Sequence, residues 1–356
     1  MALFKDMLRS DESLFKDEDS LNYDYVPKLL PYREIQQKQV AMCIKPMFED
    51  RSGKHCFVTG APGIGKTAAI RWVLRDLEDE TDEIKPFYVN CWQKNTTYKV
   101  MLELCSQLDY KFTQNKKTEE LFKVVKDLLI SKGAVFAFDE VDKLDDFDFL
   151  YTILEDIQLK SVILLTNFKE WLMDLDERIK SRLVCETLEF KPYSLAETQG
   201  ILKDRIKYAF VPTVWDDEAL RILGEKTFEK KDVRTGIFLL RESGREAEDG
   251  SSKKITTDHV SKAITKLDAF HVKNADDLED ETKKILDVVK ENSGGKIGDL
   301  YKKFQEAKGL GSYKSFQRRV EKLEKAGFVV VKKTNGGPEG NTSFVSMKEE
   351  KKITDY

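Results

Sequence analysis

The sequence has few of the residues that build metal cages and disulfide frameworks. Among its 356 residues there are five cysteines and three histidines. The cysteines are widely spaced and form no C-x-x-C pair, and His55, His259 and His271 do not have the spacing of metal ligands. This pattern argues against a zinc or redox centre, and we expect reduced core cysteines in a cytoplasmic protein.

A long apolar run is also missing. No stretch approaches the roughly 20 apolar residues that a membrane-spanning helix needs, so we expect a soluble protein with no membrane partner. Residues 1–24 are highly charged, and we expect them to form a peripheral or poorly ordered N-terminal extension. The 60 basic and 64 acidic residues nearly cancel, so only the local distribution of charge can indicate a partner.

Short apolar runs alternate with longer segments of helical periodicity in the first half of the chain. These runs are rich in β-branched and aromatic residues, and they lie at 55–59, 86–91, 134–138 and 162–165, with a possible edge strand at 184–190. Strands that alternate with helices are typical of a parallel α/β sheet. After Pro192 the pattern is helical only. We therefore predict an α/β core at residues 25–193 and a helical domain at residues 194–273.

A phosphate-binding loop of the form G-x-x-x-x-G-K-(S/T) follows the first predicted strand and opens a helix at residues 67–77. Its glycines let backbone amides surround phosphate oxygens, and the helix N-terminus adds a positive end. Lys66 would reach the β and γ phosphates, and Thr67 would offer its hydroxyl to Mg²⁺. We therefore predict that the chain binds ATP with Mg²⁺. The expected contacts are Gly60, Ala61, Pro62, Gly63, Ile64, Gly65, Lys66, Thr67 and Ala68.

Two carboxylates follow the apolar run at 134–138. A parallel strand that ends in acids beside a phosphate loop places Asp139 where it can hold Mg²⁺ through water. Glu140 would then polarise the water that attacks the γ phosphate. A strand that ends in acids is common by itself, and it is the phosphate loop that gives this pair its catalytic interpretation.

Further polar residues fit the same site. Asn167 ends the next predicted strand and would orient the attacking water, although a turn residue is the simpler interpretation. Arg178 and Arg182 lie in a charged segment beyond it, and one of them would stabilise charge on a nucleotide held by a neighbouring subunit. We favour Arg182, and a solvated helix face is the alternative for both.

Residues 281–347 have a different pattern. Three helical segments precede two short strands at 329–333 and 342–346, which a glycine-rich turn joins. Between residues 296 and 333, eleven lysines and arginines stand against four acids. This order and charge favour a winged-helix domain that binds duplex DNA, with a solvated basic helix or a protein contact as alternatives. The expected DNA contacts are Lys314, Gln317, Arg318, Arg319, Lys322, Lys332 and Lys333.

These elements, in this order, resemble the AAA+ ATPases. Three stretches are more specifically similar to the archaeal replication initiators of the origin recognition complex and cell division control type: DYVPKLLPYRE at 24–34, VNCWQKNTTY at 89–98 and EFKPY at 189–193. The resemblance covers nearly the whole chain. It implies an AAA+ core with a helical lid at 194–273, followed by the winged helix.

The resemblance also implies roles for particular residues. Val26, Pro27 and Arg33 would line the adenine pocket, Asn167 would be the first sensor of the γ phosphate, and Arg234 would be the second sensor, reaching it from the lid. Ile64 stands where the family usually has threonine, which should be tolerated because that position contributes mainly its backbone. Several relatives lack the second arginine of the Arg178 and Arg182 pair, which leaves the choice between them open.

The first functional hypothesis is therefore a replication initiator that binds origin duplex DNA, acts with other initiator subunits and recruits the replicative helicase, with slow ATP hydrolysis as a switch. A sliding-clamp loader is the second, although such proteins end in an all-helical collar. An ATP-gated transcription regulator that uses the same DNA-binding module is the third, and the sequence does not separate it from the first.

Overall fold

The computed structural model describes residues 13–130, 132–276, 280–307, 309, 312–325, 328–334 and 342–347. The chain divides into two compact units, Met1–Ala263 and Ile264–Tyr356. The division falls inside helix α10 (Thr257–Asp276), so it precedes the lid boundary that we predicted at residue 273. The predicted connection at 274–280 begins as helix, and residues 277–279 lie outside the described part of the chain.

The core of the first unit is a parallel sheet of five strands in the order β2-β3-β4-β1-β5. All four apolar runs form strands, and the fifth run forms the predicted edge strand β5. The elements in chain order are α1 (Glu34–Ile44), η3 (Lys45–Glu49), β1 (His55–Thr59), α2 (Lys66–Glu80), β2 (Ile84–Asn90), α3 (Thr97–Gln107), α4 (Thr118–Leu128), β3 (Gly133–Asp139), η4 (Val141–Lys143), α5 (Asp148–Asp156), β4 (Lys160–Thr166), η5 (Lys169–Asp174), α6 (Glu177–Lys180) and β5 (Cys185–Glu189).

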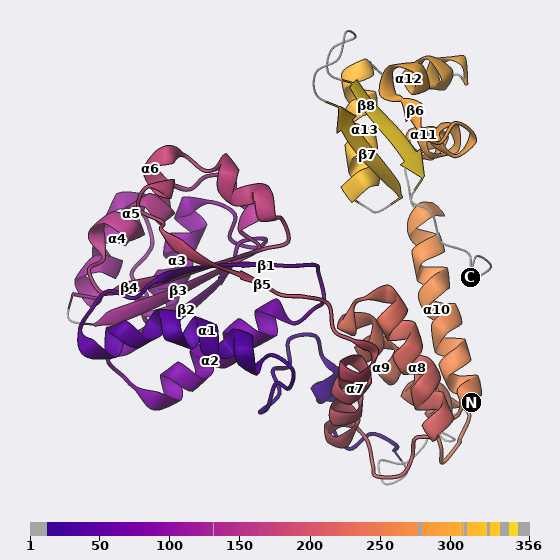
Figure 1. Cartoon of the computed structure of the whole chain (residues 1–356), viewed down its shortest axis with the longest axis horizontal. Helices are drawn as coiled ribbons and strands as arrows, with labels where there is room; N and C mark the ends of the chain where they lie inside the picture. The colour runs from indigo at the N-terminus through magenta and orange to yellow at the C-terminus, as the bar shows by residue number, and fades with distance from the viewer. Residues whose placement is uncertain are drawn as a thin grey trace. The chain divides into compact units, whose positions relative to one another are not determined.

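Helices cover both faces of this sheet. Figure 1 shows α1 and α2 on one face and α3, α4 and α5 on the other. Strand residues alternate between the two: Phe136 and Phe138 pack with α3, α4 and α5, whereas Val135 and Ala137 pack with α1 and α2. Burial on both faces explains why the strands appear in the sequence as continuous apolar runs. The carboxyl ends of β1, β3 and β4 meet at one edge of the sheet, which is where Gly60, Asp139 and Asn167 lie.

His55, the first residue of β1, is buried in this sheet. Its Nδ1 accepts a hydrogen bond from the Val162 amide at 3.1 Å, and burial, followed by the charge of Lys160, lowers its pKa from 6.5 to about 4. In the unfolded chain His55 takes up a proton near pH 6.5, whereas in the native state it does so only near pH 4. The free energy of unfolding is therefore unaffected by His55 above pH 6.5 and decreases as the pH falls toward 4. We expect a loss of roughly 2–3 kcal/mol from this residue.

Urea unfolding at pH 7.0 and pH 4.5 tests this expectation. A His55→Gln variant is the control, because its amide oxygen can accept the Val162 hydrogen bond without titrating. The variant should lose less stability between the two pH values than the parent chain. An equal loss in both proteins would show that His55 is not the titrating group.

The lid completes the first unit. It consists of α7 (Leu195–Ala209), α8 (Asp217–Lys230), α9 (Val233–Asp249) and the start of α10. Of the expected N-terminal extension, residues 13–24 pack on the lid, and residues 1–12 lie outside the described part of the chain. Leu21 is fully buried in the short helix η2 (Glu18–Leu21), Phe15 forms a β-bridge with Phe210, and Ser13 donates to Glu248 at 2.6 Å. Two leucines and a phenylalanine among the charges provide the apolar surface for this packing.

The second unit has its own core. Its elements are α11 (Asp280–Glu291), β6 (Gly295–Lys296), α12 (Ile297–Glu306), α13 (Tyr313–Lys325), β7 (Val329–Thr334) and β8 (Thr342–Met347). The strands form an antiparallel sheet in the order β6-β8-β7, of which β6 was not predicted. Leu300 and Phe304 of α12 pack against Phe316 and Val320 of α13. This order of elements is consistent with a winged helix.

Candidate nucleotide-binding site

The phosphate loop joins the end of β1 to the start of α2. Gly60, Gly63 and Gly65 have φ values of 148°, 70° and 86°, a region that other residues rarely adopt. A side chain would also not fit, since a Cβ on Gly60 would lie 2.5 Å from the Phe190 carbonyl oxygen. The loop thus presents backbone and the N-terminus of α2 as a cradle that suits phosphate groups.

Lys66, the first residue of α2, points back over this loop. Its Nζ donates to the carbonyl oxygens of Gly60 and Ala61 at 2.7 and 2.8 Å and to Asn167 Oδ1 at 2.7 Å. Burial lowers the pKa of Lys66 to about 8, an effect that Asp139 opposes and Arg234 reinforces. The structure therefore brings Lys66 and Asn167 together and places the Lys66 ammonium group at the loop.

Asp139 ends β3 and is held by three donors. Its Oδ2 accepts hydrogen bonds from Thr67 Oγ1 at 2.6 Å and from the Tyr88 hydroxyl at 2.9 Å, and its Oδ1 accepts from the Glu140 amide at 2.9 Å. A hydroxyl beside a carboxylate is a donor set that suits Mg²⁺. Among the described residues no three His, Cys, Asp or Glu side chains form a metal cage, so a metal ion here would also need phosphate and water oxygens.

Glu140 follows in a left-handed conformation with φ of 56°, which turns the chain sharply after the strand. Its pKa is raised by burial and by the neighbouring charges of Asp139 and Asp142. Asp142, which sequence reasoning did not select, accepts a hydrogen bond from Thr166 Oγ1 at 2.8 Å. A raised pKa in a half-buried carboxylate is a property expected of a general base.

Arg33 supports the loop. Its buried guanidinium donates to the Ile64 carbonyl at 3.2 and 2.9 Å and to the Lys191 carbonyl at 2.8 Å, and it stacks on the Tyr193 ring at 3.8 Å from the centroid. The resemblance implied an adenine contact but not this supporting role. The other two residues of the expected adenine pocket lie beside α2, where Arg75 donates to the carbonyls of Val26 (3.4 Å) and Pro27 (3.1 Å).

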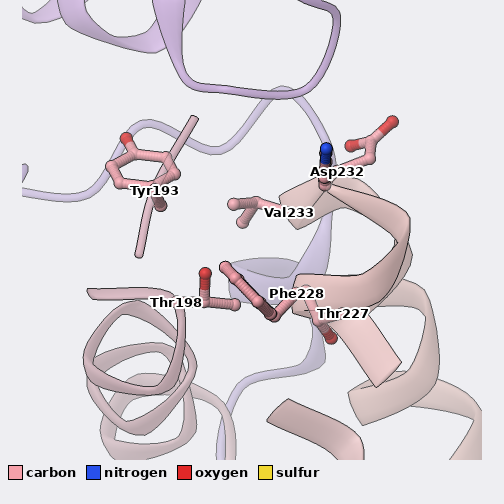
Figure 2. A pocket seen from close by; sticks show the side chains of 7 residues that line it. Tyr193, Thr198, Thr227, Phe228, Asp232 and Val233 are labelled. Carbon is pink, nitrogen blue, oxygen red and sulfur yellow. The ribbon is translucent and has the colours of Figure 1, made fainter. Parts of the chain in front are cut away.

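The lid contacts the phosphate loop directly. The Val233 amide at the start of α9 donates to the Gly63 carbonyl at 3.1 Å, and Asp232 caps α9 by accepting from the Arg234 amide at 2.8 Å. A pocket lies beside this contact, with Tyr193 on one side and the start of α9 on the other (Figure 2). Sequence reasoning did not assign a site role to its lining, which consists of Tyr193, Thr198, Thr227, Phe228, Lys231, Asp232 and Val233.

The two candidate trans arginines lie on and just after α6, on the surface of the core. Arg178 is the more exposed and pairs with Asp176 at 3.0 Å. Arg182 pairs with Glu155, donates to the Arg178 carbonyl at 3.1 Å and lies over the Tyr151 ring at 4.8 Å. Both side chains remain at the surface, and their role stays a prediction.

The candidate DNA contacts belong to the second unit. Lys314 and Arg318 on α13 and Lys332 on β7 are exposed, whereas Gln317 and Arg319 are partly buried. The side chains of Lys322 and Lys333 lie outside what the structure describes. The buried face of α13 consists of Phe316, Val320 and Leu323, and Lys314 and Arg318 lie on its exposed surface.

Two family models match the first unit. One describes an AAA domain and matches residues 49–171, and the other describes a Cdc6 AAA+ ATPase-type lid domain and matches residues 199–265. The described part of the chain has no helix that is both long and apolar enough to cross a membrane.

Relatives match nearly the whole chain. ORC1-type DNA replication protein 2 of Methanosarcina acetivorans is 31% identical over 97% of this chain and 96% of its own length. The solved structure of the Aeropyrum pernix ORC1 protein in complex with DNA has a TM-score of 0.75 and 26% identity, covering 96% of this chain and 94% of that one. The fold is also similar to that of the Aeropyrum pernix ORC2 protein in its ADPNP-ADP complexes, with a TM-score of 0.66, 18% identity and 94% coverage of both chains.

Proposed function

This chain belongs to the family of ORC1-type DNA replication proteins, and from that premise we propose that it is a cytoplasmic, ATP-dependent initiator that binds origin duplex DNA. In this proposal it assembles with other initiator subunits and helps to recruit or load the replicative helicase. The ATP dependence in this proposal is supported most by the hydrogen bond from the Val233 amide to the Gly63 carbonyl (3.1 Å). This bond couples the lid to the loop that would hold the phosphates.

The nucleotide acts as a switch in this proposal. Lys66 and the loop amides bind the phosphates, and Thr67 with Asp139 would hold Mg²⁺, which neutralises phosphate charge when bound. Glu140 accepts the proton of the attacking water and Asn167 orients that water. Arg234 contacts the γ phosphate from the lid. Arg182, or else Arg178, stabilises charge on a nucleotide held by a neighbouring subunit. Turnover is slow because the output is a conformational state.

Of the two other functions, one is weaker on structural grounds and the other needs a genomic test. A clamp loader would end in an all-helical collar, whereas the second unit of this chain contains the antiparallel sheet β6-β8-β7. A transcription regulator shares the DNA-binding module, so genomic position is the deciding observation. Footprinting across the genome with ATP and with ADP should find one or a few sites near replication starts, and occupancy of many promoters would overturn the initiator proposal.

DNA binding by α13 has a measurable signature. Lys314 and Arg318 are exposed one turn apart, so a Lys314→Glu, Arg318→Glu variant of the full chain should bind duplex DNA more weakly. The slope of log K against log salt is negative, and each lost phosphate contact reduces its magnitude by about 0.9. The pair should therefore reduce the magnitude by about 2. Fluorescence anisotropy between 50 and 300 mM salt measures this slope.

A charge-matched control comes from the lid, where Lys203 and Lys253 are also exposed. Lys203→Glu, Lys253→Glu changes the net charge equally but removes no predicted contact. If both variants lose the same affinity and slope, α13 is not the DNA-binding helix.

A further inference from the structure

The strand register brings Tyr88 to the metal side of the site. In the parallel pair of β2 and β3, Tyr88 lies level with Ala137, two residues before Asp139. Side chains two residues apart in a strand share a face, so Tyr88 and Asp139 point to the same side of the sheet. Ala137, level with Tyr88, has only a methyl side chain on this face. The phenol hydroxyl reaches Asp139 Oδ2 at 2.9 Å.

Helix α2 contacts both Asp139 and Tyr88. Thr67 and Arg71 are four residues apart and therefore lie on one face of the helix. Thr67 Oγ1 donates to Asp139 Oδ2 at 2.6 Å, while the Arg71 guanidinium lies over the Tyr88 ring at 4.9 Å from its centroid. Arg71 in turn lies 3.9 Å from the carboxylate of Asp24. The Tyr88 ring thus has a fixed place between the sheet and α2.

We propose that Tyr88 is a positioning residue for the Mg²⁺ that accompanies the nucleotide. This inference rests on the proposed nucleotide site, in which Thr67 and Asp139 hold that ion. The carboxylate of Asp139 can rotate about its Cβ–Cγ bond, and its donors determine the plane in which it stands. Tyr88 and Thr67 hold one oxygen and the Glu140 amide holds the other. Such outer partners orient a metal ligand without touching the metal.

The test is the Mg²⁺ dependence of ADP binding to the full chain, which needs no turnover. Fluorescent ADP is titrated with the parent chain and with Tyr88→Phe, in EDTA and at a series of Mg²⁺ concentrations. The variant should bind ADP normally in EDTA. The Mg²⁺ concentration for half-maximal strengthening should rise about 10-fold, as is typical when an outer partner of a metal ligand is lost. Tyr98→Phe, on the exposed side of α3, should behave as the parent does.

The possible failures have separate meanings. If the parent chain responds to Mg²⁺ and Tyr88→Phe responds identically, the positioning role is overturned while the proposed metal site stands. If ADP binding falls equally with and without Mg²⁺, Tyr88 only supports the fold, and thermal unfolding without nucleotide would show the same loss. If Mg²⁺ does not strengthen ADP binding to the parent chain, both the metal site and the positioning role are overturned.

Discussion

Changing Glu140 to Gln should leave ATP binding intact and reduce hydrolysis by at least about 100-fold, the lower end of what a general base contributes. The side chain keeps its size but can no longer take a proton. Glu140 suits that task because burial and the charges of Asp139 and Asp142 raise its pKa. The carboxylate of Asp139, in contrast, accepts hydrogen bonds from Thr67, Tyr88 and the Glu140 amide.

Single-turnover hydrolysis and fluorescent-nucleotide binding, measured on the same preparation, check this expectation. Glu119→Gln is a matched control, since Glu119 is an exposed acid in the first turn of α4. It should hydrolyse ATP at the parent rate. A Glu140→Gln protein that hydrolyses ATP normally would refute the assigned role, and one that no longer binds ATP would mean that Glu140 supports the loop instead.

Changing Lys66 to Ala should weaken nucleotide binding by about 100-fold, because charge-assisted hydrogen bonds to the phosphates are lost. Lys66 also holds the carbonyls of Gly60 and Ala61 and the Asn167 amide oxygen together, so the loop loses its central cation as well. ATP should then no longer alter the affinity of the chain for duplex DNA.

Isothermal titration with ATP measures this loss, and thermal unfolding without nucleotide checks that the loop variant still folds. Lys85→Ala provides the comparison, since Lys85 pairs with Glu78 on the surface of the same unit. Retention of parent-like ATP affinity by Lys66→Ala would overturn the assignment of the phosphate site.

The sheet and the loop could be predicted from the sequence because both depend on neighbouring residues. A strand buried on two faces has no polar positions, so it stands out as an apolar run, and the run at 134–138 differs from β3 by one residue at each end. The N-terminal extension could not be predicted in this way. Its few apolar residues are scattered among charges, and their partners, such as Phe210, lie far along the chain.

The site was predictable to the extent that it lies at strand ends. Asp139 and Asn167 follow apolar runs, and the ends of parallel strands meet at one edge. Tyr88 was not predictable, because its contact with Asp139 depends on the register of β2 against β3. Arg33 was selected by resemblance, and only the folded chain places its guanidinium against the Ile64 carbonyl. Contacts of this kind depend on tertiary geometry, which periodicity and spacing do not contain.

The packing of residues 13–24 on the lid has a consequence for the order in which the first unit folds. The hydrogen bond from Ser13 to Glu248 spans 235 positions of chain, and that from Arg205 to Ser20 spans 185. Contacts between such distant positions are slow to form, because the intervening chain must first become compact. The α/β core lies within that interval. We therefore expect the N-terminal segment to join the lid after the core has collapsed, and on a ribosome not before α7, which carries Arg205, has emerged.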